Sequence, residues 1–433
     1  MTLMDGSPAT ADLFPQFDHC VRHFEAFGPL TRSALHECSL QGNRSLQVLY
    51  HTNEFWTSLQ RQGNGLHEIS YRACFKPQLP AFFIERLTRP GEVVFDPFMG
   101  RGTTLIEAAL MDRIPMGCDV NPLSQYLVRP RLNPPSMQKV EQRLDEIPWR
   151  MEHELPDDLL VFYHPQTLRE ICALRHYLLL QEQKDLSDSV DDWIRMVALN
   201  RLTGHSSGFF SVYSLPPNQA VSVASQKRIN TRRRQSPPIR DVRSIILKKT
   251  RSLLRHCNEK VLQRLRQRSK KACLLTGQSK QLDRIKSESV SLVVTSPPFL
   301  DVVDYASDNW LRCWFLGIDS KQLEMTVPGR LDQWEEQMTC VLDELRRVLK
   351  PGGMVSMEVG EVRKGTVDLE KSVIRCGVES GFEVLMVLCQ EQAFTKTAQC
   401  WGVRNNSQGT NSQRIVLFRR PNRRSRCPSP AGG

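Results

Sequence analysis

The chain contains 433 residues, of which 40% are hydrophobic, and it carries a formal net charge of +11. This length is enough for about two or three domains, and this apolar content is enough for a buried core. There is no apolar run long enough to span a bilayer and no basic-then-apolar N-terminal signal, which argues against membrane and secreted classes and predicts a cytoplasmic protein.

The cysteines and the positive charge are distributed differently along the chain. The 13 cysteines are scattered and form no Cys-x-x-Cys pair, so we expect reduced thiols and neither a disulfide framework nor a zinc site. Residues 227–271, in contrast, hold 17 lysines and arginines and only two acids. The basic character therefore belongs to one segment, which favours a surface that follows phosphates.

The first 60 residues offer no chemistry and are interpreted as an N-terminal extension. They begin as a loose terminus, and the stretch up to Tyr50 is compatible with helix. A polar and aromatic loop follows, which contains Tyr71, Phe75 and Lys76, and a helix is then predicted over residues 80–88.

Residues 93–119 combine a strand, a glycine turn, a helix and a second strand. The first strand ends at Asp96, and the turn Phe98-Met99-Gly100-Arg101-Gly102 leads into a helix that we expect Thr103 or Thr104 to cap. The second strand ends at Asp119. Glycines let the backbone approach a ligand closely, and an acid about 20 residues further on can accept both ribose hydroxyls. The stretch predicts a nucleoside-cofactor site, and the lack of a third glycine disfavours a pyrophosphate cradle.

A mainly helical domain is predicted between residues 134 and 270. Three prolines within residues 129–135 indicate a boundary. Apolar residues then recur at helical spacing in residues 165–183 and 190–202, without an alternation of strand and helix. Residues 239–265 place apolar side chains on one helical face and cations on the other. That pattern fits a surface for nucleic-acid phosphates, and its alternative is an ordinary solvated surface helix.

A buried parallel strand over residues 291–295 ends at Ser296-Pro297-Pro298-Phe299. Consecutive prolines cannot donate to a ladder, so the backbone must leave the sheet here, at the place where open α/β folds bind ligands. The loop offers a hydroxyl, fixed carbonyls and an aromatic face. This set suits a planar base with an exocyclic amine, whose hydrogens Ser296 and the Pro297 carbonyl can accept while Phe299 stacks on the ring.

The other elements predicted in the C-terminal half continue the α/β alternation. They are a strand over 272–276 followed by Gly277-Gln278-Ser279, a helix over 331–349 stopped by Lys350-Pro351-Gly352-Gly353, a strand over 354–359, a helix over 367–380, and an antiparallel pair at 382–389 and 414–419. The long loop inside that pair, with Lys396, is expected to contact the substrate. The basic, proline-rich tail is expected to be disordered.

Two of these stretches together resemble the S-adenosylmethionine-dependent methyltransferases of amino groups in DNA, the N4-cytosine and N6-adenine family. Asp96-Pro97-Phe98-Met99-Gly100-Arg101-Gly102 is similar to the cofactor loop of that family, and Ser296-Pro297-Pro298-Phe299 is similar to its catalytic tetrapeptide. The resemblance implies an α/β fold class, with a Rossmann-like methyltransferase core, a mostly parallel sheet and a final antiparallel hairpin. A serine in the first tetrapeptide position, preceded by Thr295, is associated with N4 of cytosine, whereas an aspartate leans towards N6 of adenine.

The resemblance also implies a domain organisation and a set of site residues. The core is divided into residues 61–133 and 271–420 around an inserted, basic, target-recognition domain over 134–270, with an extension over 1–60 and a tail over 421–433. The implied catalytic residues are Ser296, Pro297, Pro298 and Phe299. The implied contacts to S-adenosylmethionine are Tyr71, Lys76, Asp96, Phe98, Gly100, Gly102, Thr103, Asp119, Asn121 and Gln278. The nucleic-acid contacts expected from the basic segment and the late loop are Arg232, Arg233, Arg234, Lys248, Lys249, Arg251 and Lys396.

The reaction implied is direct transfer of a methyl group to the exocyclic N4 of cytosine in double-stranded DNA, with the target base flipped out of the helix. No membrane and no metal are implied, because the sulfonium itself activates the methyl group, and a cognate restriction endonuclease is a possible partner. A covalent route through cytosine C5 would need a cysteine nucleophile after a proline, and the chain contains no Pro-Cys pair.

Three alternatives stay open. The target amine could be N6 of adenine, because the first tetrapeptide residue indicates a tendency only. The cofactor stretch is also similar to that of some RNA base methyltransferases, although no separate RNA-binding module is recognisable. The chain could also be a nucleic-acid-binding protein with a decayed cofactor site, because Gln278 stands where the family has an acid. A glutamine carbonyl can still accept a hydrogen bond from the adenine amino group of the cofactor.

Overall fold

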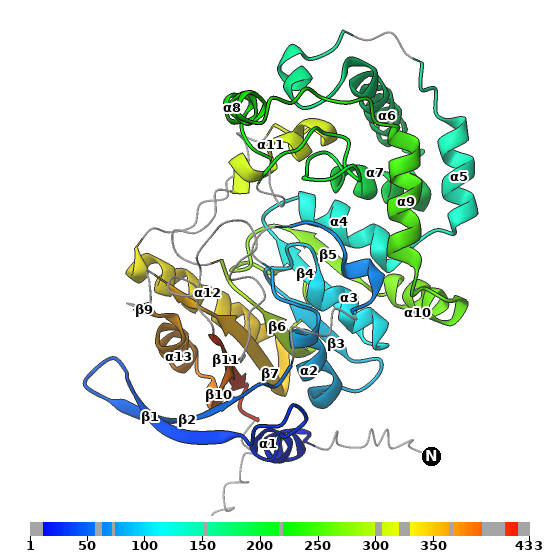
Figure 1. Cartoon of the computed structure of the whole chain (residues 1–433). Coiled ribbons are helices and arrows are strands. Elements are labelled where there is room, and N and C mark those ends of the chain that lie inside the picture. Colours follow the sequence, from blue (N-terminus) through cyan, green and yellow to red (C-terminus); the bar gives the residue numbers. More distant parts are fainter. Residues whose placement is uncertain are drawn as a thin grey trace, which may run out of the picture.

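The structure is a computed structural model, which describes residues 12–56, 63–71, 74–150, 154–215, 220–298, 305–319, 330–362, 367–391 and 412–422. Its centre is a nine-stranded sheet with helices packed on it, and a further group of helices lies beside it, at the upper right of Figure 1. Among the described residues, no helix is both long enough and apolar enough to pass through a lipid bilayer.

The sheet is mixed, with a parallel centre and antiparallel pairs on one side. Its order is β1-β2-β10-β11-β7-β6-β3-β4-β5, and the five strands from β7 to β5 are mutually parallel. The strand β11 lies antiparallel to both β7 and β10. The predicted α/β fold, mostly parallel with a final antiparallel hairpin, is confirmed. The strands are β1 (Arg32–Ser39), β2 (Ser45–Asn53), β3 (Val93–Asp96), β4 (Ile114–Asp119), β5 (Cys273–Thr276), β6 (Val290–Thr295), β7 (Leu349–Val359), β10 (Glu383–Glu391) and β11 (Ser412–Arg419), and a separate small pair consists of β8 (Glu361–Val362) and β9 (Val367–Asp368).

The direction in which the chain adds strands reverses between β3 and β6. From β3 the chain moves outward through β4 to β5, and it then returns to place β6 on the opposite side of β3. Ligands of open α/β sheets bind outside the carboxyl ends of the strands at such a reversal. The topology therefore marks the ends of β3 and β6, at Asp96 and Thr295, as the place to look for a site.

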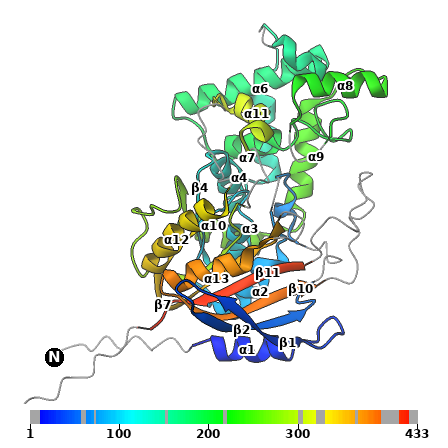
Figure 2. The same cartoon turned by 90° about the vertical axis from the view of Figure 1, so that its left-hand side faces the viewer.

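Helices cover both faces of this sheet, and the alternation of the strands decides which side chains meet them. On one face, Val94 and Leu292 belong to an apolar cluster with α1 (Phe14–Arg22) and α2 (Gln78–Leu87). On the other face, Phe95 and Val293 belong to a cluster with α12 (Leu331–Val348) and α13 (Leu369–Glu379). Figure 2 shows α1 and α13 on opposite sides of the sheet. Strands covered on both faces need the nearly continuous apolar runs seen here.

The remaining helices form one layer that shares a core with the cofactor-loop half of the sheet. Its largest apolar cluster joins Leu105 and Leu127 to Trp193 and Phe315, so the inserted segment does not have a core of its own. The helices concerned are α3 (Thr103–Leu110), α4 (Leu123–Leu132), α5 (Met137–Glu146), α6 (Pro165–Gln183), α7 (Ser189–Leu199), α8 (Val223–Arg233), α9 (Val242–Leu254), α10 (Glu259–Ser269) and α11 (Tyr305–Leu316), with short 3-10 turns at Gly65–His67 and Asp157–Val161.

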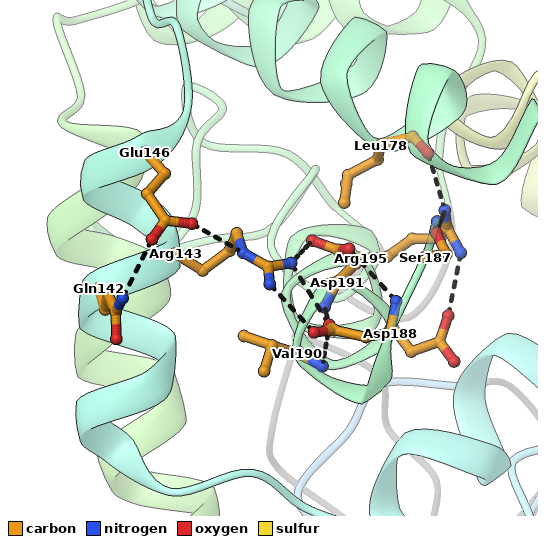
Figure 3. A network of polar contacts seen from close by, with 10 residues as sticks. Gln142, Arg143, Glu146, Leu178, Ser187, Asp188, Val190, Asp191 and Arg195 are labelled. Carbon is orange, nitrogen blue, oxygen red and sulfur yellow. Dashed lines mark hydrogen bonds and ion pairs between the residues drawn. The ribbon is translucent and has the colours of Figure 1, made fainter. Parts of the chain in front are cut away.

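A polar network fastens two helices of this layer to each other (Figure 3). Arg143 of α5 donates to Asp188 at 3.0 Å and to Asp191 at 2.5 Å, and both acids lie at the start of α7. Asp188 caps α7 by accepting from the backbone N–H groups of Val190 and Asp191. Acids at a helix N-terminus are favoured by its dipole, so one arginine here holds a cap and joins two helices.

The prediction of helix before Tyr50 is wrong for most of that stretch. From residue 12, where the description begins, only α1 is helical, and residues 32–53 form the β1–β2 hairpin, in which β2 pairs parallel with β10. The pairing connects residues about 340 positions apart, for example Tyr50 with Val387, which no local pattern can reveal. The N-terminal segment therefore extends the central sheet.

Four local expectations also differ from the structure. Residues 239–265 form two helices, because Asn258 accepts from Val261 N and starts α10 afresh. The prolines of residues 129–135 do not end α4 at once, since Pro130 lies inside it. No threonine caps α3, whose N-cap is Gly102. The Lys350–Gly353 segment lies within β7, which begins at Leu349 directly after α12.

Candidate active site

The two sequence motifs meet at the reversal of strand order. Strands β3 and β6 are neighbours, with Phe95 opposite Val293. The Thr295 hydroxyl donates to Asp96 Oδ1 at 2.6 Å, and both side chains are buried. The Thr104 hydroxyl at the start of α3 donates to the Val294 carbonyl at 3.0 Å. The predicted cofactor loop and the predicted catalytic loop therefore leave the sheet from adjacent strand ends.

Asp96 is held in an apolar environment with few compensating donors. Its carboxyl is almost fully buried and accepts hydrogen bonds from Thr295 and from Phe98 N, the latter at 3.1 Å. Burial raises the pKa of Asp96 to about 7, because the charged form loses hydration that two hydrogen bonds only partly replace. The carboxyl thus orders the turn that follows β3 and does not face solvent.

The glycines of this turn occupy positions that require glycine. Gly100 and Gly102 have φ angles of +47° and +75°. A Cβ atom at Gly102 would lie 2.4 Å from Val128 Cγ2, so α4 packs directly on its backbone. The turn is fixed from the other side by Gly100 N, which donates to Asp119 Oδ2 at 2.8 Å. The glycines therefore let the turn approach both α4 and the end of β4.

Asp119 and Asn121 link the turn to the loop that carries Tyr71. The Asp119 carboxylate, which is partly exposed, also accepts from Asn121 N at 2.8 Å. The Asn121 side-chain amide donates to the Tyr71 hydroxyl at 3.3 Å. The Tyr71 ring lies beside Gly100, close enough to stand 3.4 Å from a Cβ added there. Four of the predicted cofactor residues thus converge on one place.

The other predicted cofactor residues lie around the same turn. Gly277 N donates to the Asp119 carbonyl at 2.9 Å and the Ser279 hydroxyl donates to the Pro97 carbonyl, so the exposed Gln278 lies between two anchors to the site. Thr103 accepts from the Arg101 side chain at 3.1 Å instead of capping α3. The partly buried Phe98 packs on the sheet, and Lys76 is exposed in the loop that follows Tyr71.

Two arginines that the sequence interpretation missed hold that loop in place. Arg101 donates to the carbonyls of Ile69 and Phe75 at 3.0 and 3.4 Å. Arg131 is fully buried and donates to the carbonyls of Leu66 and Arg101, and burial lowers its pKa to about 9. The position of Arg101 between the two glycines of the turn was the available signal for the first arginine, whereas nothing local distinguishes the second.

The residues present fit an adenosyl cofactor. A partly exposed carboxylate at a strand end can accept from ribose hydroxyls, and the positive-φ turn beside it lets backbone approach the ligand. Tyr71 adds an aromatic ring and Gln278 an exposed amide. The buried Asp96 supports the turn from behind. This donor and acceptor set suits a nucleoside.

The catalytic loop is described for its first three residues. Ser296, Pro297 and Pro298 follow β6 directly, and Pro298 is anchored because its carbonyl accepts from Trp334 Nε1 at 2.9 Å. Phe299 lies outside the described residues. Ser296 lies beside the carboxyl of Glu358, a buried residue of the neighbouring β7, because Thr295 pairs with Met357. Burial raises the pKa of Glu358, and the nearby Ser296 side chain partly offsets that rise. Glu358 is a further site residue that the sequence interpretation missed, in addition to the two arginines.

The predicted nucleic-acid contacts do not form one surface. Arg232, Arg233 and Arg234 are exposed at the end of α8, whereas Lys248, Lys249 and Arg251 belong to α9. Figure 1 places α8 and α9 at opposite sides of the helical layer. Lys396 lies outside the described residues. The two basic groups therefore lie on different, separated helices.

Comparison with known proteins adds one decisive observation. Residues 33–127 match a family model described as DNA methylase, of the N6 and N4 type. The resemblance to the DNA amino-methyltransferases is confirmed over these residues. The match begins in β1 and ends in α4, so it contains the cofactor loop and extends further towards the N-terminus than the motifs indicated. It supports S-adenosylmethionine as the cofactor and leaves N4 and N6 methylation undistinguished.

Similarity to individual proteins is limited to a small part of their length. The chain is 33% identical over 81 residues to the type II methyltransferase M.MjaII of Methanocaldococcus jannaschii, which is 19% of this chain and 15% of that protein. It is 30% identical over 97 residues to the type II methyltransferase M.MvaI of Kocuria varians, 22% of this chain and 20% of that protein. The rRNA methyltransferase aviRa of Streptomyces viridochromogenes aligns over 85% of this chain and 97% of its own, with 11% identity and a TM-score of only 0.35. The fold assignment therefore rests on the strand order described above.

Proposed function

We propose that this protein transfers a methyl group from S-adenosylmethionine to an exocyclic amino group of a DNA base, and that N4 of cytosine is the target. The observation that carries the proposal is the meeting of the Asp96 turn with the Ser296 loop on adjacent strands, fixed by the Thr295 to Asp96 hydrogen bond. The family match over the cofactor-loop segment supports the class of reaction.

In this proposal the turn after β3 holds the cofactor. Asp119 accepts from the ribose hydroxyls, Asn121 and Tyr71 flank the adenine, and the backbone at Gly100 and Gly102 approaches the methionine part. When bound, S-adenosylmethionine supplies a methyl group on a positively charged sulfonium. Lys76, Phe98, Thr103 and Gln278 complete the proposed pocket, with Asp96 ordering the turn from below.

The catalytic loop would hold and orient the amine. The lone pair of an exocyclic amine is delocalised into the ring, so the amine is a poor nucleophile. The Ser296 hydroxyl oxygen and the Pro297 carbonyl can each accept one amine hydrogen, which holds the nitrogen and favours its rehybridisation. In this proposal the Ser296 hydroxyl donates its proton to the neighbouring Glu358 carboxylate, so the serine lone pairs are available for the amine.

Glu358 gives the transferred proton a destination. When nitrogen forms its new bond to carbon it becomes positively charged, and one N–H proton must leave. The Ser296 oxygen accepts that proton while its own proton passes to the Glu358 carboxylate, so the serine is regenerated and the charge on Glu358 is neutralised. Burial raises the pKa of Glu358, which makes its carboxylate a better proton acceptor than an exposed one.

The choice of cytosine over adenine rests on the resemblance of the Thr295-Ser296 start of the loop to N4-cytosine members. Phe299 is proposed to stack on the flipped base. Target recognition is assigned to the helical segment over residues 134–270, with its exposed cations contacting the DNA backbone. A restriction endonuclease that cuts the same sequence is a proposed partner of such an activity.

The test is incubation of the purified protein with unmethylated genomic DNA and S-adenosylmethionine, followed by digestion to nucleosides and mass spectrometry. We expect N4-methylcytosine with wild type, at least a hundredfold less with Ser296→Ala, and an unchanged yield with Ser291→Ala, which removes a partly exposed hydroxyl from the same strand. N6-methyladenine would overturn the base assignment and keep the reaction class. Product on RNA alone would overturn DNA as the substrate, and no product on either would overturn the activity.

A further inference from the structure

The helical layer contains a pocket that neither the cofactor turn nor the catalytic loop uses. Its volume is about 440 Å³, and it lies between the first half of α9 and the segment that follows α7. We call it the α9 pocket. Its lining residues include four cations and a single acid, and the cations are Arg201, Arg240, Lys248 and Lys249.

The single acid does not neutralise these cations, because it is used locally. The Asp241 carboxylate accepts from Ser244 N at 2.8 Å and from the Ser244 hydroxyl at 2.6 Å, as the N-cap of α9. Within the described part of the chain, no ion pair involves Arg240 or Lys248. The Nε atoms of Arg201 and Arg240 are buried without a hydrogen-bond partner there. The pocket thus has more donors and more positive charge than its own walls can satisfy.

The electrostatics of the pocket favour the binding of an anion. Burial and the nearby Arg201 lower the pKa of Lys249 to about 8, although Glu68 lies 3.7 Å from its ammonium group. Burial, with a contribution from Arg312, lowers the pKa of Arg201 to about 10. Crowded cations disfavour one another, and an anion between them would relieve that cost. Ser207 adds a hydroxyl group to the lining, and Ile239 adds an exposed apolar side chain.

The pocket borders the loop that carries Tyr71. Glu68, next to Lys249, also accepts from the Ser252 hydroxyl at 3.0 Å. Ser70 N donates to the Asn200 side chain at 2.8 Å, one residue before Arg201. Tyr71 in turn contacts the cofactor turn. The α9 pocket is therefore connected, through the loop of Glu68 to Tyr71, to the cofactor turn.

We propose that the α9 pocket binds a single phosphate of the nucleic-acid backbone near the modified base, and we call this binding site the phosphate seat. Arginine and lysine donors together with the Ser207 hydroxyl suit a tetrahedral oxyanion, and the exposed Ile239 can contact the adjoining sugar. The proposal rests on the proposed function for its substrate class. A seat of this kind fixes the position of the duplex and does not read its sequence. It is separate from the exposed arginines of α8.

The test compares duplex binding at several salt concentrations for wild type, Arg240→Gln/Lys248→Gln, and the charge-matched control Lys260→Gln/Arg266→Gln, whose cations are exposed on α10. Loss of one phosphate contact lowers the slope of log K against log salt by about one. We expect that decrease, with at least tenfold weaker binding at low salt, for the pocket variant only. Lys248→Gln, which changes an exposed side chain, provides a second variant that should fold, and unfolding midpoints verify the fold of each.

The outcomes distinguish a failure of the proposed phosphate seat from a failure of the proposed methyltransferase activity. A pocket variant with the wild-type slope and affinity overturns the seat, whether or not methyl transfer occurs. A pocket-dependent slope in a protein that transfers no methyl group supports the seat and overturns the activity. Titration of inorganic phosphate and deoxycytidine monophosphate separates the two sources of phosphate. Pocket-dependent binding of either, with no change in the duplex slope, would assign the pocket to a small phosphorylated molecule and overturn a backbone seat.

Discussion

Ser296, the first residue of the catalytic loop, lies beside the buried carboxyl of Glu358 on the neighbouring strand β7 and favours the charged form of that carboxyl. The same strand pairing places Thr295 opposite Met357. Burial raises the pKa of the Glu358 carboxyl, while the hydrogen bonds from Ser296 and Gln413 favour its charged form. An acid in this position can both orient the serine and receive a proton through it.

Replacing Glu358 by glutamine tests that role. Glu358→Gln keeps the size and a hydrogen-bonding group but cannot take up a proton, so we expect turnover to fall about a hundredfold or more with little change in cofactor affinity. Wild-type turnover should decrease as the pH falls through the raised pKa of Glu358, and the variant should lose that dependence. The control Glu383→Gln removes an exposed acid paired with Arg419 and should leave the pH profile unchanged. A Glu358→Gln profile identical to wild type would contradict the proton route.

The buried pair of Thr295 and Asp96 predicts a stability effect that does not depend on activity. Thr295→Val keeps the shape of the side chain and leaves Asp96 with one donor fewer, so the free energy of unfolding should fall by about 1–3 kcal/mol. Urea denaturation measures this change. Thr276→Val, at the exposed end of β5, is the matched control and should cost less than about 0.5 kcal/mol. Equal losses of unfolding free energy in the two variants would show that the buried hydrogen bond adds no measurable stability.

The sequence predicted correctly those parts of the molecule in which a residue restricts the backbone at its own position. The apolar run before Asp96, the glycines after it and the prolines after Ser296 each restrict the backbone where they stand, so the strand ends and the turns could be read directly. That Asp96 and Thr295 would meet follows from the general rule that strand order reverses at the site of an open sheet. The family resemblance then supplied the chemistry.

The parts that could not be predicted depend on pairing between distant segments. Glu358 lies in an ordinary apolar strand and becomes a site residue only because β7 pairs with β6. Arg131 lies in a proline-rich stretch and is recognisable only by the backbone carbonyls that surround it. The β1–β2 hairpin obtains its place from β10, near the other end of the chain. Non-local contacts of this kind leave no periodicity in a short window.

A comparison of two glycines distinguishes the free-energy cost of backbone strain from the cost of a steric clash. Gly102 and Gly91 both have positive φ angles, +75° and +86°, but a Cβ atom would clash with Val128 at Gly102 and meet nothing within 4 Å at Gly91. Gly91→Ala should therefore cost about 1–2 kcal/mol of unfolding free energy from backbone strain alone. Gly102→Ala should cost at least about 1 kcal/mol more and weaken cofactor binding, because the turn must shift. Equal costs, measured by urea denaturation, would indicate that α4 can move away from the turn.

The raised pKa of Asp96 predicts how stability depends on pH in the absence of cofactor. The folded protein holds this proton up to about pH 7, whereas the unfolded chain releases it near the ordinary value of 3.8. Between these values the folded state binds more protons, so stability should decrease as the pH rises from about 4 to about 7. The contribution is at most about 4 kcal/mol, since one pKa unit corresponds to about 1.4 kcal/mol.

Asp96→Asn should flatten that part of the stability curve, because an amide does not titrate. The groups that face Asp96 are the Thr295 and Thr104 hydroxyls, the backbone N–H of Phe98 and the carboxylate of Asp119. The control Asp119→Asn should keep a falling curve, because Asp96 remains buried, although with a smaller slope. Thermal unfolding at several pH values measures stability as a function of pH for each protein. A wild-type stability that rises between about pH 4 and pH 7 would contradict the assignment of a protonated Asp96.

The exposed arginines at the end of α8 should contribute to nucleic-acid affinity through charge alone. Arg232→Gln/Arg233→Gln/Arg234→Gln removes three exposed cations and should lower the salt slope of duplex binding by up to about 2.7, because each phosphate contact contributes about 0.9. Binding to unrelated sequences should weaken by a similar factor, since phosphate contacts carry no sequence information. The control Lys260→Gln/Arg266→Gln/Lys270→Gln removes the same charge from α10 and should change the slope by less than about one. If both variants lowered the slope equally, the effect would come from net charge, and α8 would not be a specific contact surface for the duplex.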